Sequence, residues 1–385
     1  MPARTDRTAE LARLAAQRAA AEHPDTPLDE LLATIATNDL TTLLLHAHRV
    51  RAHARTFRDL RDATERQPMT RASVADARRL HAFDAALFDI AAAHDAVALG
   101  PVSPLGSAAC AGIDPNHALA TLRLGEIAAD PTAGLALEAT RRRRSGTRTP
   151  IHLVASQRVL RMNPIGNIPG FSPHFQLAAL ASYQRASRAA DDDALDRALL
   201  AAHVATWANL FAVLPARGFR VAPGSFRVVF ADVRLTRAAL LARGGDPDAL
   251  ARQAVVHKPG STTDALAAAN IDLPRAVPAA DLAATVAALG LPRSAQSLAA
   301  ALVAELAAPL ADSHPDVPVA FDLARIQGLT YYAGPCLQLH IRHDDGRDFN
   351  LGDGGALAWL GALLDDRRER MVTTGIGAEL LAKLF

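Results

Sequence analysis

The chain has 385 residues, half of them hydrophobic, with 41 basic against 40 acidic residues and a net charge of +1. This composition excludes a globally disordered chain, and the balanced charge excludes attraction of the whole molecule to nucleic acid or a membrane surface. Cys110 and Cys336 lie far apart among small or apolar neighbours, which predicts reduced core thiols instead of a disulfide framework or a metal site. Neither a signal-peptide pattern nor a long apolar run occurs, so we expect a cytoplasmic protein without a membrane partner.

Residues 1–72 are expected to form a helical N-terminal extension. Thr26-Pro27 followed by acidic residues is typical of a helix start. His46, His48 and His53 have no carboxylate or cysteine at metal-ligand spacing, so a solvated helix face is favoured and no metal is predicted.

The next segments are expected to be a long helix and a strand. Ser73 is predicted to cap a helix that runs to about Val97. Residues 133–140 are predicted to form a leucine-rich strand. Residues 141–144, four arginines, form either the exposed first turn of a helix or a phosphate-binding patch, and the lack of interleaved aromatic residues favours the exposed face.

In the middle of the chain, the sequence patterns predict two strands joined by a long loop, followed mainly by helices. Residues 151–155 and 175–181 have strand patterns, and the loop between them is rich in proline and glycine. A helix at 191–212, a strand at 226–230 and a helix at 235–243 follow. Alanine- and leucine-rich helices are expected at about 246–313.

The segment from 321 to 342 carries the strongest functional pattern. Its apolar runs are typical of strands, and Gly328 and Gly334 allow unusual backbone angles or close approach. Tyr331 and Tyr332 are predicted to lie on opposite faces of a strand that lines a ligand. A hairpin turn at 344–346 then leads to the glycine-rich residues 352–355.

These segments, in this order, resemble the histidyl-tRNA synthetases. The run from Gln327 to Tyr332 is similar to the Arg-Gly-Leu-Asp-Tyr-Tyr signature of that family, with Gln327 and Thr330 in place of its arginine and aspartate. The segment 151–182 looks like the second motif of class II synthetases. Residues 373–381 are similar to the third motif, with Leu380 in place of the ATP-binding arginine.

The resemblance implies an α+β fold with an antiparallel active-site sheet and flanking helices. The implied domains are an extension at 1–72 and a synthetase-like core at 73–385, with a helical insertion at about 246–313 and no anticodon-binding domain.

The resemblance also implies a set of site residues. Arg161 matches the arginine that binds the α-phosphate, whereas Asn163 and Leu180 replace two family glutamates, the second of which binds imidazole. The implied ligand-binding residues are Glu138, Thr140, Arg161, Gln176, Tyr331 and Tyr332.

We therefore expect a catalytically degenerate paralogue that binds an amino acid or related small ligand. It resembles the regulatory subunit of ATP phosphoribosyltransferase, so we expect a homodimer that works with a catalytic partner subunit and does not bind tRNA. One alternative is a stand-alone amino-acid ligase that uses ATP and Mg²⁺, with Arg161 steadying the adenylate. Another is a structural scaffold.

Overall fold

The structure is a computed structural model that describes residues 7–110, 112–162, 172–188, 192–254 and 260–385. Its centre is a nine-stranded sheet in the order β1-β4-β5-β11-β10-β9-β6-β8-β7. The strands are β1 (Asp95–Ala96), β4 (Ile151–Leu160), β5 (His174–Arg185), β6 (Arg227–Asp232), β7 (Val277–Pro278), β8 (Val319–Phe321), β9 (Pro335–Arg342), β10 (Asp348–Leu357) and β11 (Glu369–Ile376). Neighbouring strands are antiparallel except in the pairs β1 with β4 and β6 with β8, so the predicted antiparallel α+β architecture is confirmed.

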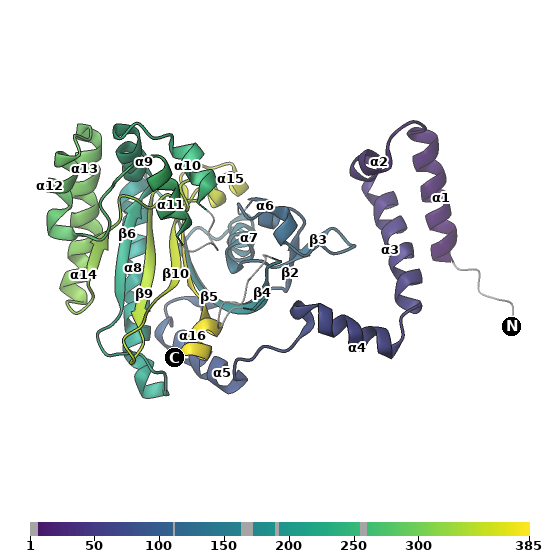
Figure 1. Ribbon diagram of the computed structural model, residues 1–385, viewed down its shortest axis with the longest axis horizontal. Helices are drawn as coiled ribbons and strands as arrows, with labels where there is room; N and C mark the ends of the chain where they lie inside the picture. The colour runs from purple at the N-terminus through teal and green to yellow at the C-terminus, as the bar shows by residue number, and fades with distance from the viewer. Residues whose placement is uncertain (1–6, 111, 163–171, 189–191, 255–259) are drawn as a thin grey trace.

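Most of the helices flank this sheet, and those nearest the N-terminus extend away from it (Figure 1). They are α1 (Arg7–Glu22), α2 (Leu28–Thr34), α3 (Thr37–His53), α4 (Phe57–Arg66), α5 (Ala77–Ile90), α6 (Ser107–Cys110), α7 (Pro131–Arg144), α8 (Asp192–Val213), α9 (Val233–Ala242), α10 (Pro247–Gln253), α11 (Ser261–Ala268), α12 (Leu282–Ala288), α13 (Arg293–Leu302), α14 (Ala308–Ser313), α15 (Trp359–Leu364) and α16 (Ala378–Leu384). A small second sheet pairs β2 (Val102–Pro104) with β3 (Gly125–Ile127).

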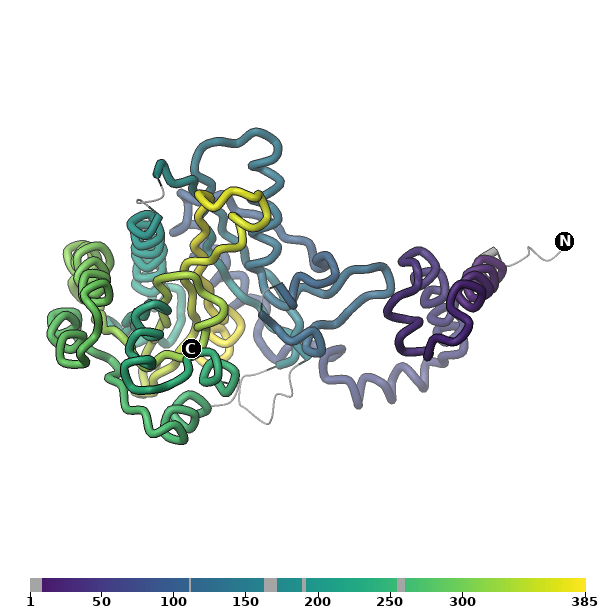
Figure 2. The backbone as a smooth tube through the Cα atoms, turned by 90° about the horizontal axis from the view of Figure 1, so that it is seen from above, coloured from purple at the N-terminus to yellow at the C-terminus, as the bar shows by residue number. Residues whose placement is uncertain are grey.

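Helices α1 to α4 extend away from the sheet (Figures 1 and 2). They bury few apolar side chains, namely Ala12, Ala15, Ala19 and Ile35. This part of the chain is therefore helical and has only a small core of its own.

Helix α7 corrects the strand predicted at 133–140. Asp130 caps this helix by accepting a hydrogen bond from the Thr132 amide at 2.8 Å, and Pro131 occupies the first turn. An aspartate cap followed by proline is a strong helix start, and the alanines and leucines that follow are good helix formers. The four arginines consequently form the last turn of a helix instead of the first, where the helix dipole favours positive charge.

Two smaller expectations also differ from the structure. Helix α5 is capped by Asp76, not by Ser73, and ends at Ile90, because the chain then turns to pair Asp95–Ala96 with β4. Cys336 is buried as expected, but Cys110 is exposed, since α6 lies at the surface.

The region predicted as a helical insertion is mostly helical from α10 to α14, apart from β7. Within the described residues one helical run, Arg293–Ser313, is long and apolar enough to cross a membrane by length and composition alone. Leu302, Leu306 and Leu310 of this run belong to the hydrophobic core, which is the behaviour of a helix packed inside a folded domain.

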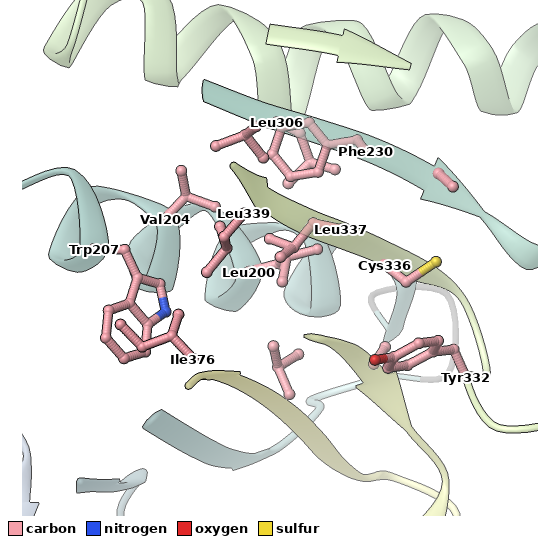
Figure 3. Close-up of a cluster of buried hydrophobic side chains, with 14 of the residues drawn as sticks. Leu200, Val204, Trp207, Phe230, Leu306, Tyr332, Cys336, Leu337, Leu339 and Ile376 are labelled. Atoms are coloured by element: carbon pink, nitrogen blue, oxygen red, sulfur yellow. The ribbon is translucent and has the colours of Figure 1, made fainter. Parts of the chain in front are cut away.

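The core lies between the sheet and α8. Leu337 and Leu339 of β9 point toward Leu200 and Val204 of α8, and Tyr332 lies at one end of this cluster near Cys336 (Figure 3). We call the sheet face against α8 the back face and the opposite one the front face. Strand residues alternate between the two, so the β9 side chains on the front face are Cys336, Gln338 and His340.

Candidate ligand-binding face

Gln176 and Leu180 of β5 lie on the back face. The Gln176 amide donates to Asp84 of α5 at 2.8 Å and to Ser156 at 2.7 Å. Leu180 is fully buried and pairs with Thr374, whose hydroxyl accepts a hydrogen bond from Trp207 of α8. Gln176, predicted to bind the ligand, therefore points toward the helices, because the register of β5 turns its side chain to the back face.

Glu138 and Thr140 are engaged within α7. Glu138 forms ion pairs with Arg141 and Arg142 at 2.8 Å, and hydrogen bonding from Arg141 is the main cause that lowers the pKa of Glu138 to about 2. The Thr140 hydroxyl donates to the carbonyl of Ala136 at 2.8 Å. Glu138 and Thr140, both predicted to bind the ligand, therefore have partners on their own helix.

The residues at the N-terminus of α7 hold the Arg161 side chain. Arg161 donates from Nε to the Ala129 carbonyl at 2.8 Å and from Nη2 to Asp130 at 2.9 Å. Its guanidinium also lies 5.5 Å from the centre of the Phe175 ring. Arg161 is therefore held in place by the protein itself. Asn163 and the rest of the second-motif loop to 171 lie outside the described residues.

Tyr331 and Tyr332 lie in a turn before β9, not on a strand as predicted. Gly328 opens this turn with φ of +85°, and a Cβ there would lie 2.7 Å from the Tyr332 ring. Both the backbone angle and the close ring therefore require glycine. The two phenol rings meet edge to face with centres 4.9 Å apart, and Trp359 of α15 contacts Tyr331 at 5.6 Å.

Carboxylates from two other elements affect the pKa values of Tyr331 and Tyr332. Burial raises the pKa of each tyrosine, and the carboxylate of Asp353 adds to that rise in both. Asp130 further raises the pKa of Tyr331. Asp130, which caps α7, and Asp353 of β10 therefore both act on the Tyr331 hydroxyl. Because its pKa is raised, this phenol is protonated at neutral pH.

Arg325 and Asp353 are site residues that the sequence patterns did not identify. The Arg325 side chain is only 4% exposed, and its Nη2 lies 3.5 Å from a carboxylate oxygen of Asp353. Its guanidinium is 5.5 Å from the centre of the Tyr332 ring. Among the described residues, its Nε and Nη1 have no hydrogen-bond partner.

Asp353 points from β10 onto the front face, opposite Gln338. Its side chain is 60% exposed, yet its pKa is raised because the surrounding protein desolvates it, with Arg325 opposing that effect. One sequence feature could have identified Asp353: it is the acidic residue within the glycine-rich run 352–355. Small neighbours of this kind let strands approach closely.

The third-motif helix offers no cation at the predicted position. Leu380 packs against the hydrophobic core, and the neighbouring Glu379 is buried with Lys383 and Arg158 as ion-pair partners, each at 2.7 Å. In the described parts of the chain, no group of three or more histidine, cysteine, aspartate or glutamate side chains is arranged to hold a metal ion.

Comparisons with known proteins agree with this architecture. No family model matches the sequence, and no curated protein matches it. Solved structures do match. An ATP phosphoribosyltransferase regulatory subunit/histidyl-tRNA synthetase from Bacillus halodurans is 15% identical with a TM-score of 0.59, over 80% of this chain and 78% of that one.

Two further structures give the same result. A histidine–tRNA ligase subunit from Alicyclobacillus acidocaldarius is 19% identical with a TM-score of 0.58, over 82% of this chain and 96% of that chain. Histidyl-tRNA synthetase from Nostoc is 14% identical with a TM-score of 0.57, over 82% of this chain and 73% of that chain. With the mostly antiparallel sheet and its flanking helices, these likenesses show that the chain has the class II fold of histidyl-tRNA synthetases.

Proposed function

We propose that this protein is a non-acylating relative of the synthetases that binds a small amino-acid-like ligand on the front face. One observation carries the proposal: Arg161, expected to bind the α-phosphate, is already engaged by Ala129, Asp130 and Phe175. Activating an amino acid with ATP requires preorganised cations where charge develops on the phosphates. An arginine tied to the protein is poorly placed for that task, and Leu380 cannot perform it.

The charges of the front face suit a zwitterion. Asp353 can accept an ammonium group, and Arg325, 3.5 Å away, can donate to a carboxylate. The rings of Tyr331, Tyr332 and Trp359 add apolar surface beside these charges. An amino acid presents both charged groups on one carbon, so it can satisfy both side chains at once.

A regulatory role in histidine biosynthesis is the finer form of this proposal. The likeness to a Bacillus halodurans protein described as an ATP phosphoribosyltransferase regulatory subunit/histidyl-tRNA synthetase supports it. In this role the protein is cytoplasmic, assembles with a catalytic subunit and does not charge tRNA. Leu180 does not argue against histidine as the ligand, because its side chain lies on the back face.

Calorimetric titration with each common amino acid tests the binding proposal. We expect at least one amino acid to bind the wild-type protein, and Asp353→Asn to weaken it about tenfold or more by removing the charge-assisted contact to the ammonium. Asp366→Asn is the matched control, since this carboxylate pairs with Arg185. No binding of any amino acid, or equal loss in both variants, contradicts the proposal.

The ligase alternative is favoured by one observation, the buried cation Arg325 beside Tyr332. Such an enzyme requires ATP and Mg²⁺. Pyrophosphate exchange measured with each amino acid separates the two functions. We expect no exchange above background; exchange that disappears in Arg161→Ala establishes the ligase instead.

The proposed homodimer has a candidate surface next to edge strand β1. Exposed apolar side chains gather there around the β2–β3 sheet, namely Val102, Leu105, Leu119 and Leu124. Apolar groups of this kind mark interaction sites. Light scattering after gel filtration should give a dimer for the wild type and a monomer for Leu105→Glu. Leu241→Glu, at an exposed position of α9, should remain a dimer.

A further inference from the structure

The front face carries a second group of nitrogen-rich side chains, one step along the strands from Asp353. Arg227 of β6 and His340 of β9 are directly opposite each other in the sheet. Gln338, the neighbour of Asp353, lies two residues before His340 on the same strand. Two strand residues span about 7 Å, so this group lies one side-chain row away from Asp353.

Within the described residues the hydrogen bonding of these side chains is incomplete, although Arg227 and Arg325 each lie near one carboxylate. Among the described residues, Nε of Arg227 and Nε2 of His340 are buried without a hydrogen-bond partner, as are two nitrogen atoms of Arg325. The nearest carboxylate to Arg227 is that of Asp348, 3.8 Å from Nη2. Arg342 shares Asp348, from which its Nε is 3.3 Å away.

The two arginines also act on the histidine between them. Burial is the main cause that lowers the pKa of His340 to about 4, and Arg227 and Arg325 lower it further, against the effect of Asp348. We call Arg227 and His340 the row. The electrostatic potential at its neutral imidazole is therefore raised by the two arginines. Unpaired buried donors destabilise a protein unless a partner is supplied.

We propose that this row binds an oxyanion on the side chain of the ligand, so that the site prefers an amino acid whose side chain ends in a carboxylate or phosphate. The inference rests on the proposed function, which places the ammonium at Asp353 and the α-carboxylate at Arg325. The side chain of the bound amino acid then extends along β9 to Arg227 and His340. A planar guanidinium paired with an oxyanion supplies directional, charge-assisted bonds.

Matched ligand pairs test this preference by calorimetry on the full chain. L-glutamate is compared with L-glutamine, and O-phospho-L-serine with L-serine, because each pair differs in the terminal charge. A charge-assisted hydrogen bond favours the anionic member by about 10- to 100-fold. Preference for glutamate alone assigns the site to carboxylates, and preference for phosphoserine alone assigns it to phosphates.

Variants locate the preference at the row. Arg227→Gln should remove most of the discrimination, because it weakens glutamate binding much more than glutamine binding, and Arg227→Lys should retain part of it. Arg220→Gln, an exposed arginine that pairs with Asp344, is the control and should bind like the wild type. Thermal unfolding of each variant separates a lost contact from a lost fold.

The outcomes distinguish this inference from the proposal on which it rests. Binding of amino acids without preference for the charged members overturns the inference alone. A preference that survives in well-folded Arg227→Gln also overturns it. Absence of binding by any amino acid overturns both.

Discussion

At the scale of single residues, the back face holds a chain of polar groups inside the core. His152 shares a hydrogen bond of 2.8 Å with Ser182, which shares another of 2.8 Å with His203. His203 continues to Thr374 at 3.1 Å. His94 lies beside the first and last imidazoles, with ring centres 5.6 Å and 5.8 Å away. Burial lowers the pKa of all three histidines, to about 4 for His94.

This cluster predicts loss of stability in mild acid. In the unfolded chain each histidine binds a proton below about pH 6.5, whereas in the folded chain it stays neutral to lower pH. The unfolded state therefore gains protons first, and the free energy of unfolding should fall as the pH decreases from about 6.5 toward 4. Urea denaturation at pH 7 and pH 5 measures the effect.

The contribution of His94 is isolated by comparing the wild type with His94→Gln. Carboxylates such as Asp84 and Asp196, whose pKa values are raised by burial, titrate in both proteins and cancel. The variant should lose less stability between the two pH values. An identical loss in both proteins would show that His94 does not contribute.

At the scale of elements, β10 depends on its glycines. The β9–β10 pairing shifts register between Asn350 and Gly352. A Cβ on Gly352 would lie 1.9 Å from the Gly375 carbonyl oxygen of β11, and one on Gly355 would lie 2.7 Å from the Cβ of Cys336. Glycine at these positions therefore lets β9, β10 and β11 pack closely around Asp353.

We expect Gly352→Ala to destabilise the protein by about 3 kcal/mol or more, because backbone atoms must move to admit the new methyl group. Gly100→Ala is the control: its Cβ would meet the Val102 carbonyl at an ordinary 3.6 Å, and the change should cost less than about 0.5 kcal/mol. Chemical denaturation of both variants decides the matter. Equal stabilities would mean that the strands are less closely packed than this geometry requires.

At the scale of the whole molecule, α1 to α4 are separate from the main core. Within the described chain, the hydrophobic core cluster contains no residue before Phe83. The junction with the core is polar, for example the 2.6 Å hydrogen bond between His174 and the Arg71 carbonyl. The extension therefore adds little to the stability of the sheet.

A chain that begins at Gln67 should fold with nearly the same Tm as the full chain. It retains Arg71 and the whole core, and each 1 kcal/mol of lost stability lowers Tm by only about 2–4 °C in a domain of this size class. Calorimetric unfolding of both chains provides the measurement. A drop of more than about 10 °C would show that the extension is part of the cooperative core.

The sequence by itself determined the elements that rest on local periodicity. The strands on either side of the second-motif loop, helix α8, the β9–β10 hairpin and the helical extension all follow patterns within a few neighbouring residues. Their order also identified the fold. Where two local signals competed, as at α7, the Asp130–Pro131 cap decided the outcome against the strand pattern that follows it.

Only the tertiary structure decided which side chains meet. A one-residue difference in the assumed register of β5 moves Gln176 and Leu180 from the ligand face to the helix-covered face, because side chains alternate along a strand. The approach of Arg325 to Asp353 is similarly absent from any local pattern, since a loop before β9 and the middle of β10 come together through sheet pairing. Burial and pairing are properties of the folded molecule. They determine that Arg161 is occupied, while two nitrogen atoms of Arg325 have no hydrogen-bond partner among the described residues.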